Sequence, residues 1–346
     1  MNYYRSAALI LALLLTGCDA KDNNITKSVS KKSDYDAVFK NLEFECVHES
    51  TKLPALDADA ESLYRYGLHL TQAGRLKNLD QAARYYRIAA AFVHYRAATR
   101  LQGLLSQGLT SSPRPERETI NLVEELMASN IPGAYYDMGH YLESGYGVKQ
   151  DVEAARYYFR RAADLGNPEG LYYAGESLVR IKEASGIAFL MIRCATEQGH
   201  TAASFRYATV RQVQEDFGEA IRGYQTAIRA GDSSAAMVLK KSFLGPKQSN
   251  ALYKLGLDED KERSRRYGLI VEFLRRYEHL GAKVPDIDQI VPLPPAKLPE
   301  WDETFEWKRK RDAAVPPSAP SEELIARMCE EKDLDPATGW PLSGLK

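Results

Sequence analysis

A repeat of about 36 residues constrains this chain more than any other feature of its sequence. Small residues recur at one slot of a predicted first helix, in steps of 36, 36, 36 and 33: Gly67, Gly103, Gly139, Gly175 and Ala208. A slot in a predicted second helix keeps nearly the same period: Ala90, Leu126, Ala162, Ala195 and Ala227. Two ladders with one period predict tandem helical hairpins. Because a single hairpin cannot bury its apolar face alone, the hairpins must stack on one another.

The clearest copy of the unit covers residues 133–167. Its defining residues are Gly139 in the first helix, the turn 145–148, and Ala155, Tyr158 and Ala162 on one face of the second helix. These residues resemble a Sel1-like repeat, a relative of the tetratricopeptide repeat, although Leu142 stands where that family usually has tyrosine. The resemblance implies an all-α fold: a right-handed α-solenoid of five to six hairpins over residues 59–283, with a degenerate second unit and an insertion near residues 245–260 in the sixth.

The first eighteen residues predict export and lipid anchoring. Arg5 precedes an apolar stretch, residues 7–15, that is too short to span a bilayer as a helix. The Leu-Thr-Gly-Cys sequence ending at Cys18 resembles the lipobox of bacterial lipoproteins, which implies lipidation of Cys18, a signal peptide over residues 1–17 and a periplasmic location. Asp19 resembles the signal that retains lipoproteins in the inner membrane. Residues 18–36 are polar and predict a flexible tether, followed by an N-terminal segment over 37–58.

Residues 284–346, which follow the repeats, differ from them in amino-acid composition. Prolines there exclude a continuous helix, yet apolar residues such as Ile287, Leu293 and Trp301 are interleaved with them. We therefore expect an extended Pro-rich module that packs on the solenoid, with one short helix around residues 322–332. The module resembles an uncharacterised domain that follows Sel1-like repeats in bacterial proteins.

Three cysteines remain after Cys18. Cys194 falls in a small-residue slot of a repeat and is interpreted as a buried thiol. Cys46 and Cys329 flank the solenoid, and they are a candidate disulfide in an oxidising compartment if the C-terminal tail folds back.

The composition and motifs favour binding over catalysis. A formal net charge of −1 with 27% charged residues gives no field that would attract nucleic acid. The six histidines are scattered, and neither a zinc spacing, a nucleophile elbow, a Cys-x-x-Cys pair nor a phosphate-binding loop is present. We therefore expect no metal, no cofactor and no enzyme activity, and we expect a protein partner.

Two further ladders on the first helices are candidate contact sites, because an α-solenoid offers a concave surface there. Tyrosine and arginine are typical interface anchors. The predicted partner-binding residues are Arg65, Tyr136, Asp137, Tyr172, Tyr173, Phe205 and Arg206. The alternative interpretation is that the aromatic residues among them pack between repeat units.

Sel1-like lipoproteins of this arrangement resemble immunity proteins that protect bacteria from type VI secretion effectors, particularly those of the phospholipase D class. The resemblance implies that the solenoid binds a cognate phospholipase in the periplasm and occludes it. An envelope adaptor that neutralises nothing is the alternative from another class, and an enzyme in the C-terminal module is a third.

Overall fold

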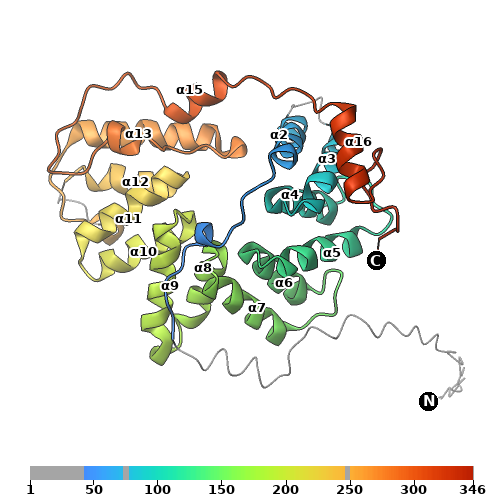
Figure 1. The fold of residues 1–346 in the computed structure, drawn as a ribbon. Helices are drawn as coiled ribbons and strands as arrows, with labels where there is room; N and C mark the ends of the chain where they lie inside the picture. The colour runs from blue at the N-terminus through green and yellow to red at the C-terminus, as the bar shows by residue number, and fades with distance from the viewer. Residues whose placement is uncertain (1–42, 73–77, 246–249, 346) are drawn as a thin grey trace, which may run out of the picture.

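The chain is a stack of helical hairpins. The computed structural model describes residues 43–72, 78–245 and 250–345, and over these ranges it forms six hairpins and no strand (Figure 1). The hairpins are α2 Ala58–Gln72 with α3 Leu79–Ala91, α4 Tyr95–Ser106 with α5 Pro115–Ala128, α6 Pro132–Ser144 with α7 Val152–Asp164, α8 Pro168–Leu178 with α9 Ser185–Glu197, α10 Thr201–Val213 with α11 Phe217–Ala230, and α12 Ser233–Ser242 with α13 Lys261–Arg276. The predicted all-α solenoid is confirmed.

The interrupted sixth unit is also confirmed, since the short helix η5 (Ala251–Tyr253) lies between α12 and α13. The predicted signal peptide, Cys18 and the tether over residues 18–36 lie outside the described residues. None of the described helices combines the length and the apolar character that crossing a bilayer requires.

The small-residue ladder marks the points where the two helices of a hairpin approach closely. A Cβ atom at Gly139 of α6 would lie 2.6 Å from Cε1 of Phe159 in α7, and one at Gly67 of α2 would lie 2.6 Å from Cε1 of Tyr86 in α3. Gly103, in the degenerate second unit, has no neighbour closer than 3.9 Å. At Gly67 and Gly139 the missing side chain therefore makes room for an aromatic ring, and at Gly175 of α8 it makes room for Ile192.

Polar side chains cap the first helices at equivalent positions. Nδ1 of His94 accepts from the backbone N–H of Ala97 at 3.1 Å, and Nδ1 of His200 accepts from Ala203 at 3.0 Å. Asn167 fills the same position before α8. Such caps satisfy donors that the helix leaves unpaired, so these two histidines have a structural role.

The C-terminal module first lies against the last hairpin. The short helix η6 (Glu278–Leu280) precedes it, and it contains the short helices α14 (Ile287–Ile290) and α15 (Glu306–Asp312). Phe305 stacks on Phe273 of α13 with 3.9 Å between ring centroids. The guanidinium group of Arg266 donates to the carbonyl oxygens of Ile290 and Pro299, at 2.8 Å each. These bonds satisfy carbonyl groups of a segment that forms no continuous helix.

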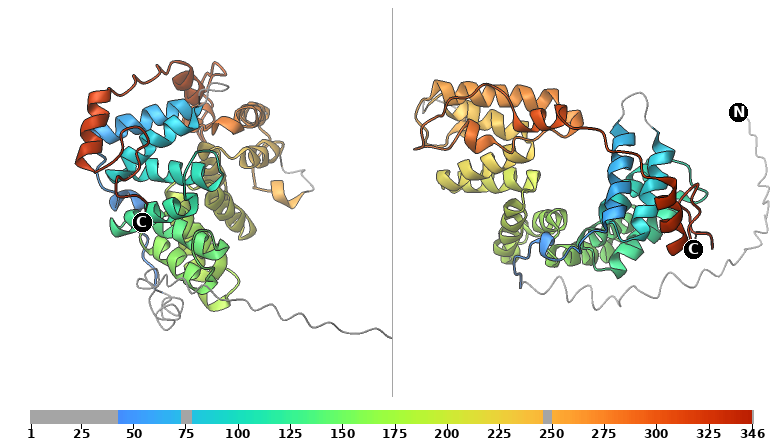
Figure 2. Two further views of the ribbon diagram at one scale, coloured as in Figure 1. Left: turned by 90° about the vertical axis from the view of Figure 1, so that its right-hand side faces the viewer. Right: turned by 45° about the horizontal axis from the view of Figure 1, so that its top comes forward.

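The module then returns to the opposite end of the stack. The solenoid curves so that its first and last hairpins face one another, and residues 313–321 connect them (Figure 2). Helix α16 (Glu322–Glu331) packs on α3, where Ile325, Met328 and Cys329 are fully buried with Leu63. A terminal repeat needs such a cover, because no neighbouring repeat buries its outer apolar face. The C-terminus supplies the cap of the N-terminal hairpin.

The described part of the N-terminal segment does not lie beside the first hairpin, although it leads directly into α2. Residues 43–53 lie along the turns between α7 and α10, where Arg160 donates to the carbonyl of Glu43 and the N–H of Glu49 donates to Gln198 at 2.8 Å. This path brings Cys46 to α9, where it forms a disulfide with Cys194.

The predicted Cys46–Cys329 pair is therefore wrong, as is the interpretation of Cys194 as a buried thiol. The tail does fold back onto the first hairpin, as that pair required, but Cys46 lies at the fourth hairpin. Cys329 remains a buried free thiol under α16. His48 lies close to the Cys46–Cys194 bridge, but the two sulfurs are bonded to each other, and only a thiolate serves as a metal ligand.

Candidate functional site

The predicted contact residues all lie on first helices, but they differ in what they touch. Arg65 of α2 is exposed and pairs with Glu61 at 2.7 Å. Arg206 of α10 pairs with Glu176 of α8 at 2.8 Å. Both arginines therefore already have a carboxylate partner within the chain, and each is an exposed or half-exposed surface group.

The aromatic residues of the predicted set are half-buried. Phe205 contacts Tyr224 of its own hairpin edge to face, with 5.5 Å between centroids. Tyr173 lies 3.9 Å from Phe159, and its hydroxyl donates to Glu143 at 2.5 Å. Tyr173 therefore makes a contact between repeat units, as the alternative interpretation expects, whereas Phe205 packs within its own unit.

Tyr172 packs on His200, near the paired Glu176 and Arg206. Tyr136 packs on Phe159, with 5.7 Å between ring centroids, and it also borders an acidic environment. Asp137 lies beside Tyr136 on α6, Glu169 occupies the first turn of α8, and Glu49 begins the short helix η2 (Glu49–Thr51). We call Glu49, Asp137 and Glu169 the acidic cluster. Glu49 Oε1 accepts from Asn167 Nδ2 at 2.9 Å, and this bond holds the N-terminal segment against α8.

The carboxylates of the acidic cluster perturb one another. The pKa of Asp137 is raised to about 7, first because burial penalises the charged form and then because Glu169 and Glu49 are nearby negative charges. The pKa of Glu49 is raised by burial and by Glu169, against the hydrogen bond from Asn167. Burial raises the pKa of Tyr136, and the charges of Glu169, Asp137 and Glu143 raise it further. In all three groups burial is the main cause of the raised pKa, and neighbouring carboxylates add to it.

The described residues supply no cation to this cluster. None of its three carboxylates forms an ion pair with a described residue, whereas exposed acids elsewhere commonly do. His200, whose ring lies 5.0 Å from that of Tyr172, is the adjacent imidazole. Burial lowers its pKa, although Glu169 opposes the shift, so the neutral form is favoured near neutral pH.

Gln102 of α4 lies beneath the cluster. It is 2% exposed, and its Oε1 accepts from the hydroxyl of Tyr141 at 3.1 Å. Its amide nitrogen is directed to Asp137 and lowers that residue's pKa, but it closes no hydrogen bond of ordinary geometry. A buried amide donor without a satisfied partner is uncommon in folded proteins and marks this position.

Sequence reasoning identified Asp137, Tyr136 and Tyr172 as candidates but missed Glu49, Glu169 and Gln102. Glu169 and Gln102 lie on the first helices that carry the contact ladders, at positions other than the two that were followed. Glu49 precedes the first repeat, so no periodicity could assign it to α6 and α8.

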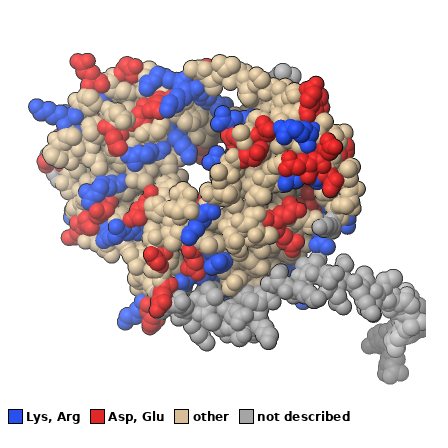
Figure 3. Space-filling view, in the orientation of Figure 1, with Lys and Arg blue, Asp and Glu red and all other residues tan. Residues whose placement is uncertain are grey.

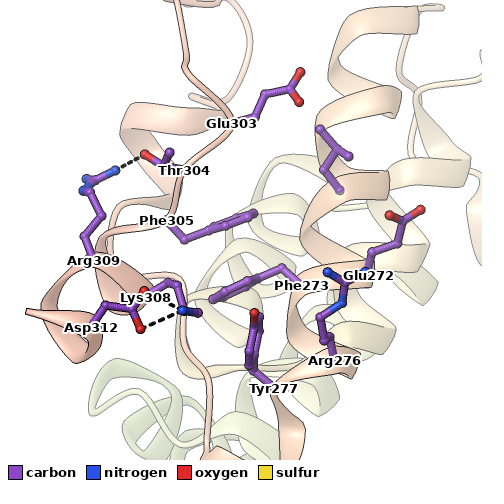
Figure 4. Close-up of a pocket in the computed structure, with 11 residues that line it drawn as sticks. Glu272, Phe273, Arg276, Tyr277, Glu303, Thr304, Phe305, Lys308, Arg309 and Asp312 are labelled. Atoms are coloured by element: carbon purple, nitrogen blue, oxygen red, sulfur yellow. Dashed lines mark hydrogen bonds and ion pairs between the residues drawn. The ribbon is translucent and has the colours of Figure 1, made fainter.

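Elsewhere, the described surface has opposite charges at its two ends. Figure 3 shows lysines and arginines gathered mainly over α13 and α15, and aspartates and glutamates mainly over α2 and α16. A cavity of about 400 Å³ lies between α13 and α15 (Figure 4). Its rings, Phe273 and Phe305, pack on each other, and its Lys308 pairs with Asp312 at 2.6 Å. Because its charged side chains are paired and its rings are packed on each other, we interpret this cavity as part of the packing of the module and not as a site of proton transfer.

Comparisons with known proteins agree with this architecture. The Sel1 repeat profile matches residues 60–91 and 132–167, and a domain of unknown function, DUF6396, matches residues 235–342, from α12 through α16. No curated protein sequence matches the chain.

Several solved structures are similar. The chain is similar to the immunity protein PA5088 of Pseudomonas aeruginosa, with 23% identity, a TM-score of 0.59, and 73% of this chain and 94% of that one covered. It is also similar to the immunity protein Pa5087 of the same organism, with 24% identity, a TM-score of 0.57, and coverage of 73% and 95%. At these identities the likeness establishes the fold. The chain thus carries Sel1 repeats and is a Sel1-repeat α-solenoid, whose last third matches a family of unknown function.

Proposed function

We propose that the protein is an immunity protein: it binds a cognate phospholipase effector of the type VI secretion system and inhibits it by occluding its active site. The observation that carries this proposal is the likeness to the two Pseudomonas aeruginosa immunity proteins, which extends over nearly the whole of their lengths. The fold is compatible with many functions, so the role has to be tested on the partner.

The proposed mode of action is binding without chemistry. A solenoid can cover an enzyme because its hairpins together present one long surface to a partner. The acidic cluster has no nucleophile paired with a base, and Tyr136 beside it belongs to a residue type that is enriched among interface anchors. We therefore propose a role in protein binding, with no turnover and no cofactor.

We further propose that Cys18 carries the lipid anchor and holds the protein on the periplasmic side of the cell envelope, with Asp19 favouring the inner membrane. A phospholipase acts at a membrane surface. An inhibitor tethered to the same surface meets it at a high effective concentration, which strengthens inhibition without any additional contact.

The test is protection in cells. A phospholipase effector of the proposed class, directed to the periplasm, should lyse its host, and coexpression of the full-length chain with its cognate effector should prevent lysis. A Cys18→Ser variant tests the anchor, because it should protect less well at equal expression. A catalytically inactive phospholipase is the control for toxicity of expression alone. Lysis that continues in the presence of the folded protein would reject the immunity role and favour an envelope adaptor.

A further inference from the structure

The disulfide lies beside two other side chains that can bind a metal ion. The sulfurs of Cys46 and Cys194 and a ring nitrogen of His48 all lie within 4.8 Å of one another. Over residues 43–72, 78–245 and 250–345, no other three cysteine, histidine or acidic side chains bring their ligand atoms so close together. Glu197 Oε2 lies 3.8 Å from Cys46 Sγ and 3.8 Å from His48 Nε2. Four side chains with potential ligand atoms therefore meet at one place.

Two short segments supply these four side chains. Cys46 and His48 are two residues apart on a stretch that forms no helix, and Cys194 and Glu197 are three residues apart on one face of α9. Figure 1 shows the N-terminal segment passing beside α9. Zinc sites typically take their ligands from pairs of residues with such short spacings. Because Cys46 and Cys194 are 148 residues apart, the sequence alone does not reveal that the two pairs meet.

The separations suit a tetrahedral zinc ion. With ligands at about 2.0–2.3 Å, such an ion holds neighbouring ligand atoms about 3.3–3.8 Å apart. The two separations measured from Glu197 Oε2 already meet that requirement. Only the two sulfurs, which are bonded to each other in the oxidised chain, have to move apart. Thiolate and imidazole ligands favour zinc over calcium or magnesium, which prefer oxygen ligands alone.

The charges around the site are also suitable for zinc. Two thiolates and one carboxylate carry one negative charge more than Zn²⁺ neutralises. Arg193 offsets that excess, because its Nε donates to Glu197 Oε1 at 2.9 Å. This bond leaves Oε2 free to bind the metal and fixes the orientation of the carboxylate. Hydrogen bonds of this kind behind a metal ligand typically strengthen metal binding.

Contacts other than the disulfide hold the N-terminal segment at α9. The N–H of Glu49 donates to Gln198 at 2.8 Å, and Asn167 Nδ2 donates to Glu49 Oε1 at 2.9 Å. Gly166 lets the carbonyl group of Val47 approach so closely that a Cβ at this position would overlap it. None of these contacts involves a sulfur atom. Reduction of the disulfide should therefore leave the two thiols opposite each other.

We propose that reduction of the disulfide creates a zinc site in this protein. Its four ligands are Cys46, His48, Cys194 and Glu197. The same two cysteines thus form a covalent cross-link when oxidised and a metal site when reduced, and in both states they fasten the N-terminal segment to α9. The inference does not rest on the proposed function, because it concerns only this chain and its metal ion.

A dithiol can supply the reduction. One thiolate of the dithiol attacks Cys46 Sγ, which is exposed, and buried Cys194 leaves as a thiolate. The second thiolate of the dithiol then displaces Cys46, so the reductant becomes a disulfide and the protein holds two thiolates. Zn²⁺ binds both thiolates, and the two protons of the dithiol pass to the solvent.

The first experiment compares metal binding by the two redox states. The full-length chain carrying Cys18→Ser, in mild detergent, is reduced with a phosphine, freed of reductant without oxygen and titrated with Co²⁺ and then Zn²⁺. The reduced protein should show thiolate-to-cobalt charge-transfer absorption and the visible bands of tetrahedral Co²⁺, and Zn²⁺ should abolish both. The oxidised protein should show neither, because it has no thiolate at the site. Absence of these bands from reduced protein that keeps its helical circular dichroism would overturn the proposal.

Matched variants test the two ligands that are not cysteines. His48→Gln and Glu197→Gln should each weaken Co²⁺ binding by at least about 10-fold. Both variants keep the disulfide, so their folding can be verified in the oxidised form before reduction. The controls are His279→Gln, at an exposed histidine of η6, and Glu153→Gln, at an exposed carboxylate of α7 that pairs with Arg156 at 3.0 Å. Both controls should bind as wild type does, and equal binding by His48→Gln and wild type would contradict the proposal.

Zinc should also protect the reduced cysteines. Stoichiometric Zn²⁺ should slow alkylation of Cys46 by a maleimide at least about 10-fold, because the metal occupies the thiolate that would react. It should raise the Tm of the reduced protein and leave that of the oxidised protein unchanged. Cys329→Ser should not alter either result, because Cys329 is a buried thiol under α16. Unchanged alkylation and an unchanged Tm in the reduced protein would refute the zinc site.

Discussion

Replacing Asp137 with asparagine should stabilise the free protein, and the gain should grow with pH. The folded state holds the pKa of Asp137 at about 7, because burial and the negative charges of Glu169 and Glu49 disfavour ionisation. In the unfolded chain the pKa is about 3.9. Below pH 4 both states are protonated and the charge has no effect. From pH 4 to 7 the unfolded state ionises first, so rising pH lowers the free energy of unfolding of the wild type until the folded pKa is passed.

The magnitude follows from the interval between the two pKa values. Each pH unit within it changes the free energy of unfolding by about 1.4 kcal/mol. A comparison of pH 5 with pH 8 covers about two such units, which sets an upper bound of about 2.7 kcal/mol. Because the Asp137 side chain is only half-buried and water can reach an ionised carboxylate, we expect about 1–2 kcal/mol. Asparagine cannot ionise, so the variant escapes this loss.

Urea unfolding at pH 5, 6, 7 and 8 measures the difference. The midpoint of Asp137→Asn should move to higher urea than that of wild type as pH rises, with unchanged slope of the transition. Glu153→Gln should follow wild type at every pH. Glu169→Gln should lower the folded-state pKa of Asp137, so that the loss of stability is smaller and ends at a lower pH. A difference between Asp137→Asn and wild type that is constant from pH 5 to 8 would refute the electrostatic account of the cluster.

Four other substitutions test how the fold is held together. Gly139→Ala should lower the free energy of unfolding, measured in urea, by about 1–3 kcal/mol, because the new Cβ would lie 2.6 Å from Phe159. Gly103→Ala should raise it by about 0.5–1 kcal/mol, because no atom lies closer than 3.9 Å to the new Cβ. Equal effects of the two substitutions would refute the explanation that the ladder glycines allow helices to approach. Cys46→Ser should lower stability by about 2–4 kcal/mol, and reduction of the wild type should reproduce that loss. Met328→Ala should cost about 2–5 kcal/mol and selectively reduce hydrogen-exchange protection in α2 and α3, and unchanged protection there would show that α16 does not cap the first hairpin.

The hairpins could be predicted from the sequence because the signal is local. Gly67 and Gly139 recur at one period since each must admit an aromatic ring from a helix that follows within the same unit. The degenerate second unit is equally informative: Gly103 keeps the period, but no ring fills the space beside it. The repeat period therefore predicts which helices pair. Which side chain packs beside each ladder residue depends on positions outside the ladder.

The disulfide and the acidic cluster could not be predicted in the same way. Both depend on the path of residues 43–53, which belong to no repeat and lie along the turns between α7 and α10. Cys46 had two chemically acceptable partners, and only the path of the segment decides between Cys194 and Cys329. Asp137 was identified because it occupies a ladder position, but Glu49 comes from outside the repeats.

The disulfide and the acidic cluster also depend on each other physically. Glu49 follows Cys46 by three residues, and it would move away from Asp137 and Glu169 if repulsion alone decided its place. The bond from Cys46 to Cys194 and the hydrogen bond from the N–H of Glu49 to Gln198 oppose that movement. The cross-link therefore holds Glu49 in place against this repulsion.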